Sequence, residues 1–158
     1  MSDVNVLVIG AGPAGMVGGQ ALDLAAVQPT VTQQQVEEIH ALKTAALLGA
    51  AAELGAIAAG AGSADVAKAR AYGLALGRCF QATDDILDVT GDAATLGKTP
   101  GKDARENKPT LVAALGIDGA RAEARRLAGE VQRAAAELGC RAGDLAFDLA
   151  LHLLGRRS

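Results

Sequence analysis

The stretch FQATDDILD, residues 80–88, places three carboxylates close together at the end of a long segment rich in alanine. On a helix, Asp84 and Asp88 are four residues apart and Asp85 and Asp88 three, so the side chains can share one edge. Like charges this close repel one another unless a cation lies between them. Mg2+ binds carboxylate oxygens and keeps other positions for water and phosphate. The stretch therefore predicts a magnesium site; the alternative is a solvated acidic helix end.

The composition favours helices over sheets. The chain has 158 residues, the size of one ordinary domain, and half of them are hydrophobic. Only two Phe, one Tyr and no Trp are present, and the apolar residues are mostly Ala and Leu. Closely packed helices suit such residues, whereas a β-sandwich needs aromatic and β-branched ones. We therefore expect an all-α fold.

Charge and cysteine content limit the partners and the compartment. The net charge of -3 gives no sign of a nucleic-acid binder. Cys79 and Cys140 lack metal-ligand spacing, which predicts two free thiols in a reducing compartment. The uncharged stretch between Asp3 and Asp23 is broken by glycine and proline, so we expect neither a signal peptide nor a membrane span. These features predict a soluble, cytoplasmic protein.

Residues 4–15, VNVLVIGAGPAG, match the G-x-G-x-x-G pattern of dinucleotide-binding folds through Gly10, Gly12 and Gly15. Such a fold needs a second strand about 20 residues later that ends in an acidic residue. At that distance the chain reads QQQVEEIHALKT, residues 33–44, which is a helical pattern. A flavin or NAD site in this segment is therefore the weaker alternative.

A long helix is predicted over residues 33–59. Its apolar stripe is Val36, Ile39, Leu42, Ala46 and Leu47. Lys43 and Thr44 lie one turn after His40, and a lysine beside a threonine hydroxyl suits an anionic group such as a diphosphate. A lysine extending from the surface of an amphipathic helix is the alternative interpretation.

Further helices are predicted at residues 64–89, at 111–115 and from Asp118 onward, where arginines and glutamates form charge pairs. Between the first two lies a polar loop, residues 91–110, with four basic residues: Lys98, Lys102, Arg105 and Lys108. Carboxylates that hold a metal beside a basic loop that neutralises oxygens suit diphosphate chemistry. Ordinary solvated loop composition is the alternative.

Five motifs occur in the order and at the spacing of one known family. They are GMVGGQALDL (15–24), HALKT (40–44), FQATDDILD (80–88), GDAATLGKTPGKD (91–103) and NKPT (107–110). In these motifs the chain resembles the trans-polyprenyl diphosphate synthases of the farnesyl and geranylgeranyl diphosphate synthase type. The resemblance implies an antiparallel helix bundle of the isoprenoid synthase type, about half of the usual fold. Residues 16–158 would be its C-terminal half and residues 1–15 an atypical N-terminal segment.

The resemblance also implies a reaction and a site. The family joins an allylic diphosphate head to tail to isopentenyl diphosphate, with Mg2+. Three aspartates match the second aspartate-rich motif and would bind the metal: Asp84, Asp85 and Asp88. Lysines that match those holding the allylic diphosphate are Lys43, Lys98 and Lys108, and matching hydrogen-bonding neighbours are Thr44 and Gln81. The expected catalytic residues are Lys43, Asp84 and Lys98.

The chain departs from the family pattern because only one DDxxD motif is present. Family members carry another aspartate-rich motif and the residues that bind isopentenyl diphosphate in their first half. We therefore expect a prenyltransferase fragment that is not active alone and that forms a homodimer or associates with a full-length prenyl synthase. The alternative is a non-catalytic partner subunit of such a synthase.

Overall fold

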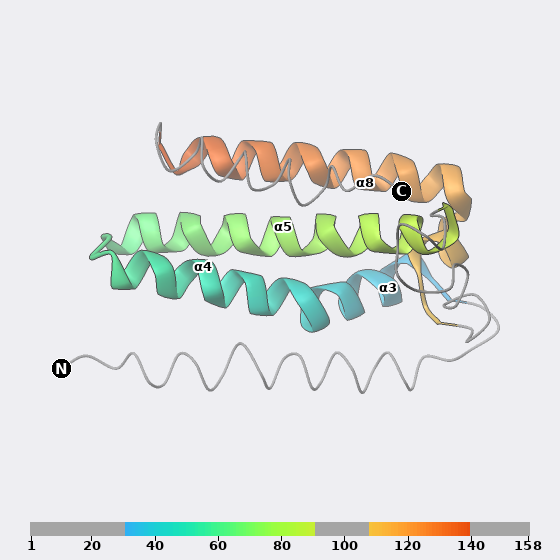
Figure 1. Cartoon of the computed structure of the whole chain (residues 1–158), viewed down its shortest axis with the longest axis horizontal. Coiled ribbons are helices and arrows are strands. Elements are labelled where there is room, and N and C mark those ends of the chain that lie inside the picture. Colours follow the sequence, from blue (N-terminus) through green and yellow to red (C-terminus); the bar gives the residue numbers. More distant parts are fainter. Residues whose placement is uncertain (1–30, 91–107, 140–158) are drawn as a thin grey trace.

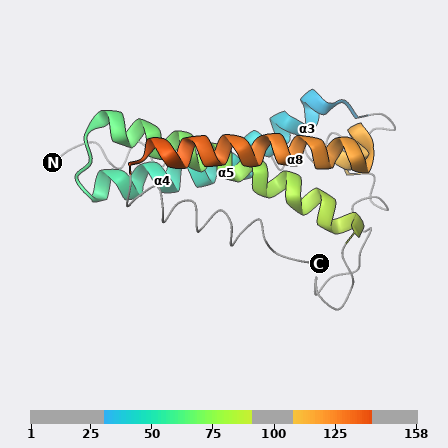
Figure 2. The ribbon, with the colours of Figure 1, turned by 90° about the horizontal axis from the view of Figure 1, so that it is seen from above.

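The structure, a computed structural model, describes residues 31–90 and 108–139, and in these ranges it contains helices and no strand. The elements in chain order are α3 (Gln33–His40), the π-helix η1 (Ala41–Ala45), α4 (Ala46–Ala58), α5 (Ser63–Thr90) and α8 (Leu111–Glu137). Helix α5 lies between α4 and α8, and it runs antiparallel to both (Figure 1). Figure 2 shows α8 lying over α5 when the bundle is seen from above. The predicted all-α class is confirmed.

Helix α3 begins at a capping box. The Thr32 hydroxyl accepts a hydrogen bond from the backbone N–H of Gln35, and the Gln35 side chain accepts one from the backbone N–H of Thr32 at 2.9 Å. Two backbone donors that have no partner inside the helix are thereby satisfied. The local sequence thus fixes where the helix that carries His40 begins.

The predicted helix over 33–59 is present, but it contains a π-helical turn, η1, at Ala41–Ala45. A π-turn pairs residues five apart instead of four and so turns the following residues to a different face. Val36 and Ile39 are buried as predicted, whereas Leu47 is 43% exposed and its placement in the apolar stripe was wrong. Past the π-turn, Gly49 and Ala50 are buried instead.

Helices α4 and α5 approach one another closely because α5 presents two glycines. A Cβ atom added at Gly77 would lie 2.4 Å from the Cα of Ala45, and one added at Gly73 would lie 2.4 Å from the carbonyl oxygen of Leu48. Neither position has room for a side chain, so the two backbones are in direct contact. This contact holds the π-helical segment against the middle of α5.

The opposite face of α5 packs on α8 through a shared apolar core that includes Tyr72, Leu76, Cys79, Leu127 and Val131. Cys79 is a free thiol, as predicted, and its burial raises its pKa to about 11. Cys140 lies outside the described residues. The thiol of Cys79 is therefore protonated at neutral pH and acts as a small apolar group.

Helix α8 is broken near its start by Gly116, whose φ of 71° lies in the left-handed region. This break separates the predicted short helix at 111–115 from the predicted helix that follows. In that second part, Arg126 pairs with both Glu123 and Glu130, which confirms the predicted charge pairs. At the start of α8, the Thr110 hydroxyl caps the helix by accepting a hydrogen bond from the N–H of Ala113 at 3.1 Å.

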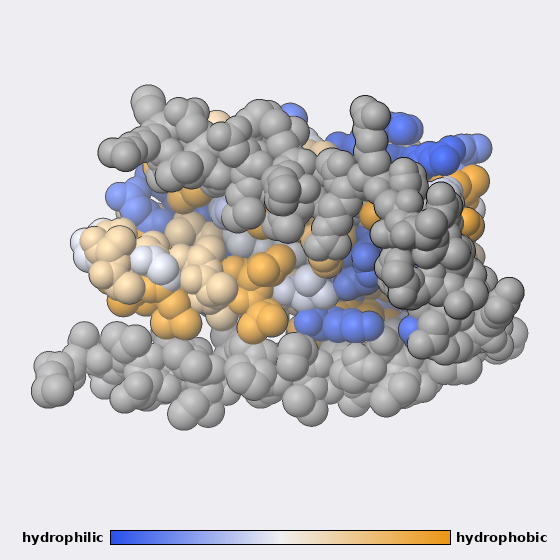
Figure 3. All heavy atoms as spheres, in the orientation of Figure 1, coloured by the Kyte–Doolittle hydropathy of each residue, from blue (hydrophilic) through white to orange (hydrophobic). Residues whose placement is uncertain are grey.

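The segment Gln33–Ala58 is, by length and composition alone, long and apolar enough to cross a membrane. Hydrophobic residues gather over α4 in the space-filling view, and hydrophilic ones lie at the α3 end (Figure 3). The segment packs along α5 through the glycine contacts described above. Those contacts are the ones expected of a helix in a bundle.

We expect Gly77→Ala to lower the free energy of unfolding by about 1–3 kcal/mol, because the added methyl group would overlap the Ala45 backbone. The matched control is Gly55→Ala, where an added Cβ meets nothing within 4 Å. That change should raise stability by about 0.5–1 kcal/mol through helix propensity. Urea denaturation followed by circular dichroism measures both, and equal effects of the two substitutions would contradict the close packing.

Candidate functional site

Two side-chain contacts join the HALKT segment to the FQATDDILD segment. The Thr44 hydroxyl donates to the side-chain oxygen of Gln81 at 2.9 Å, and Nε2 of His40 lies 3.2 Å from Oδ2 of Asp85. The partners are four residues apart on each side, so the contacts lie about one helical turn apart along an antiparallel pair. The two motifs that the resemblance assigns to one site therefore lie side by side.

Asp85 lies at the meeting point of three elements. Its Oδ2 accepts a hydrogen bond from the backbone N–H of Leu111 at 2.8 Å, in addition to the contact with His40. The side chains of Asp85 and His40 are each 5% exposed. Leu111 is the first residue of α8, so its N–H has no partner inside the helix and lies at the positive end of the helix dipole. The buried carboxylate is therefore compensated by two polar contacts.

The other predicted site residues are placed as follows. Asp88 is buried, at 1% exposure, while Asp84, Lys43 and Lys108 are half-buried. Lys108 lies three residues before Leu111, so the start of α8 brings it to the same end of the bundle as the aspartates. Lys98 lies outside the described residues, as do the glycines of residues 10–15.

A magnesium ion with phosphate and water ligands fits part of this donor set. Within residues 31–90 and 108–139, no group of three His, Cys, Asp or Glu side chains is arranged to hold a metal ion. Mg2+ is usually bound by one or two carboxylates together with substrate phosphates. Asp84 and Asp88, four residues apart, can supply two carboxylates from one edge of α5, whereas Oδ2 of Asp85 is taken by His40 and Leu111.

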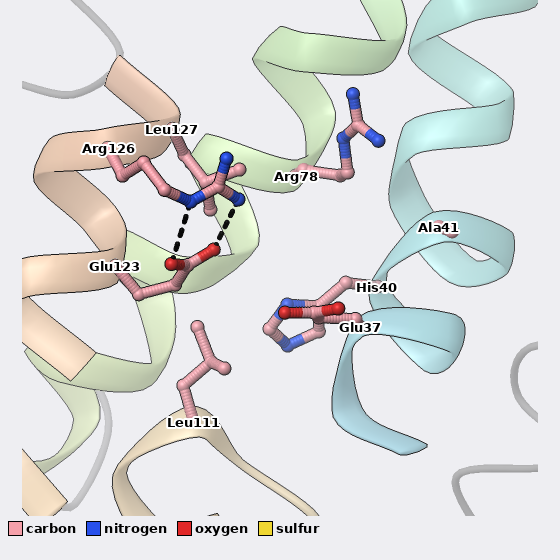
Figure 4. Close-up of a pocket in the computed structure, with 8 residues that line it drawn as sticks. All are labelled: Glu37, His40, Ala41, Arg78, Leu111, Glu123, Arg126 and Leu127. Carbon is pink, nitrogen blue, oxygen red and sulfur yellow. Dashed lines mark hydrogen bonds and ion pairs between the residues drawn. The ribbon is translucent and has the colours of Figure 1, made fainter. Parts of the chain in front are cut away.

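A cavity of about 110 Å³ lies beside His40, between α3, α5 and α8 (Figure 4). Its lining comprises Glu37, His40, Ala41, Arg78, Leu111, Glu123, Arg126 and Leu127. Glu123 and Arg126 face one another across a two-pronged hydrogen bond, which lowers the pKa of Glu123 and raises that of Arg126. Pockets for small molecules usually measure about 300–1,000 Å³. This cavity is too small for a prenyl chain, and these two charges neutralise each other.

Sequence reasoning did not assign a role to His40 or to the backbone N–H of Leu111. A usable signal was present, because His40 and Thr44 have the same four-residue spacing as Gln81 and Asp85. In an antiparallel helix pair, equal spacing lets both pairs meet in one register. The hydrogen bond from Leu111 carries no such signal, since it depends on where α8 docks.

Comparison with known proteins identifies the class. The sequence model described as Polyprenyl synthetase matches residues 9–139, most of the chain. The chain belongs to the polyprenyl synthetase family. It is 43% identical over 139 residues to a farnesyl diphosphate synthase of Escherichia coli, a match that covers 87% of this chain and 46% of the relative. The chain thus spans about half the length of the curated relatives it matches.

Solved structures give the same result for the fold. A geranyltransferase of Helicobacter pylori, complexed with magnesium and isoprenyl diphosphate, superposes with a TM-score of 0.83 at 30% identity and covers 98% of this chain and 52% of that one. A geranylgeranyl pyrophosphate synthase gives a TM-score of 0.89 at 24% identity, covering 98% of this chain and 61% of that one. The prediction of an isoprenoid synthase fold, present as about half of the usual bundle, is confirmed.

We expect Asp85→Ala to lower the free energy of unfolding by about 1–3 kcal/mol, because it leaves the buried His40 ring and the Leu111 N–H without their acceptor. Asp118→Ala is the matched control, since that side chain is 94% exposed, and it should change stability by less than about 0.5 kcal/mol. Urea denaturation measures both variants. Greater stability of Asp85→Ala would show that repulsion among the aspartates outweighs the two contacts.

Proposed function

We propose that the chain binds an allylic diphosphate together with Mg2+, as one half of a site for head-to-tail condensation with isopentenyl diphosphate. The observation that carries the proposal is the pairing of the HALKT and FQATDDILD segments through Thr44–Gln81 and His40–Asp85. Family membership supports it, and so does the likeness to a geranyltransferase whose structure holds magnesium and isoprenyl diphosphate. A cytoplasmic location is proposed with it.

Each predicted residue takes a role that suits its chemistry. The ammonium groups of Lys43, Lys98 and Lys108 would neutralise diphosphate oxygens, as charges on a transferring group must be. Thr44 and Gln81, which already share a hydrogen bond, would extend that network to the diphosphate. Asp84 and Asp88 would hold Mg2+, which when bound supplies positive charge against the leaving diphosphate.

The proposed reaction breaks the bond between the allylic carbon and the diphosphate oxygen, and the bonding electron pair leaves with the diphosphate. The double bond of isopentenyl diphosphate then forms the new carbon–carbon bond, and the resulting cation loses a proton to the released diphosphate, which restores a double bond. The residues expected to assist the departure of the diphosphate are Lys43, Asp84 and Lys98. Alanine-rich helices such as α4 offer few nucleophiles that would capture a cationic carbon.

Catalysis would need the family's residues that lie outside the matched stretch, which covers 46% of the length of the E. coli relative. We propose association with another copy or with a full-length prenyl synthase. A non-catalytic partner subunit, the alternative function, would bind the same allylic diphosphate without supplying catalysis. Mixing the chain with a full-length synthase bearing an inactivated second aspartate-rich motif separates the two, since only a catalytic half restores product formation.

In wild-type chain, titration calorimetry should show that geranyl diphosphate, an allylic diphosphate, binds only when Mg2+ is present. Asp84→Ala should weaken that binding by about tenfold or more, because one metal ligand is lost, while the helical content stays unchanged. Asp65→Ala is the matched control on the same helix, since Asp65 is exposed at the far end of α5 and pairs only locally with Lys68. Unchanged Mg2+-dependent binding in Asp84→Ala would refute the metal assignment.

A further inference from the structure

His40 is a buried polar residue that the proposed chemistry does not use. It is the last residue of α3, is 4% exposed, and precedes the π-turn that carries Lys43 and Thr44. Its ring lies 3.2 Å from Asp85, which is itself buried. A buried imidazole in contact with a buried carboxylate restricts the orientation of both groups, because breaking the contact would leave a buried polar atom without that partner.

The two contacts of Asp85, with His40 and with the N–H of Leu111, join the three described segments that carry predicted site residues. Asp85 lies between Asp84 and Asp88 on α5, His40 lies one turn before Lys43 and Thr44, and Leu111 opens α8 just after Lys108. One carboxylate oxygen of Asp85 accepts from α8 and meets the ring on α3, so a rotation of α5 about its axis would break both contacts. The rotation of α5 is thereby set at the turn where its acidic residues lie.

We propose that His40 is a positioning residue for the diphosphate site. It acts through Asp85 and aims Asp84 and Asp88 toward the diphosphate held by Lys43 and Lys108, without touching the ligand itself. The inference rests on the proposed function, since it concerns the site at which that function places Mg2+ and the allylic diphosphate. It assigns Asp85 to holding α5 in place, where the sequence predicted a third metal ligand.

Loss of His40 should affect the site more than the fold. The Thr44–Gln81 hydrogen bond, one turn away, still joins the same two segments, and the close contact of Gly77 with Ala45 lies one turn further. Helix α5 therefore stays docked while its acidic turn loses one of two contacts that orient it. Residues that orient metal ligands without binding the metal themselves typically change metal affinity measurably when they are mutated.

The test compares two substitutions of one residue. His40→Leu replaces the ring with an apolar side chain of similar bulk that cannot bind Asp85. His40→Gln introduces a side-chain amide whose N–H can donate a hydrogen bond to Asp85. Titration calorimetry with geranyl diphosphate and Mg2+ should show binding weakened about tenfold in His40→Leu and restored to within about threefold of wild type in His40→Gln. Without Mg2+, none of the proteins should bind.

Two controls separate positioning from general destabilisation. Val131→Ala removes methyl groups from the α5–α8 core, where Val131 is 1% exposed, and should lower the denaturation midpoint without weakening Mg2+-dependent binding. In an Asp85→Ala background, His40→Leu should cause no further loss, because both changes break the same contact.

Each outcome decides between the claims. If wild-type chain binds no geranyl diphosphate with Mg2+, the proposed function fails and the role of His40 fails with it. If wild-type chain binds and His40→Leu binds equally well, only the positioning role is overturned. The same holds if His40→Gln is as weak as His40→Leu, or if Val131→Ala weakens binding to the same extent.

Discussion

The buried carboxylate of Asp85 is the constraint on which this end of the bundle depends. A carboxylate that is almost fully removed from water is costly unless polar groups surround it. Here the N–H at the start of α8 and the ring of His40 on α3 provide those groups, at 2.8 and 3.2 Å from the same oxygen. Helices distant in sequence must therefore converge at one turn of α5.

Close helix packing makes that convergence possible. Gly73 and Gly77 let α5 touch the backbone of the neighbouring helices, and the π-turn at Ala41–Ala45 shifts which residues face inward. The Thr44–Gln81 hydrogen bond fixes the register at the same place. The residues proposed to bind the diphosphate therefore lie beside this close contact between the helices, which suits a site that must hold its groups in place.

The sequence predicted the all-α fold class, the span of α5 and the break in α8. These features depend on local patterns: the periodicity of alanine-rich segments and the glycine and threonine residues at which helices stop and start. It placed Leu47 on the wrong face, since a π-turn depends on tertiary contacts that no periodicity records. Its grouping of Asp85 with Asp84 and Asp88 as metal ligands stays a prediction, because helical spacing shows which side chains share an edge but not which of them a neighbouring helix engages. The contact of His40 with Asp85 becomes visible only when that neighbouring helix is in place.

The most direct test of the account is the hydrogen exchange of the Leu111 backbone amide, measured by NMR in wild-type chain and in Asp85→Ala. The account predicts strong protection in wild type, because this N–H is buried and bonded to the carboxylate, and a selective loss of protection in the variant. An unprotected amide in wild type, or equal protection in both proteins, would show that Asp85 does not hold the start of α8 and would contradict the central claim.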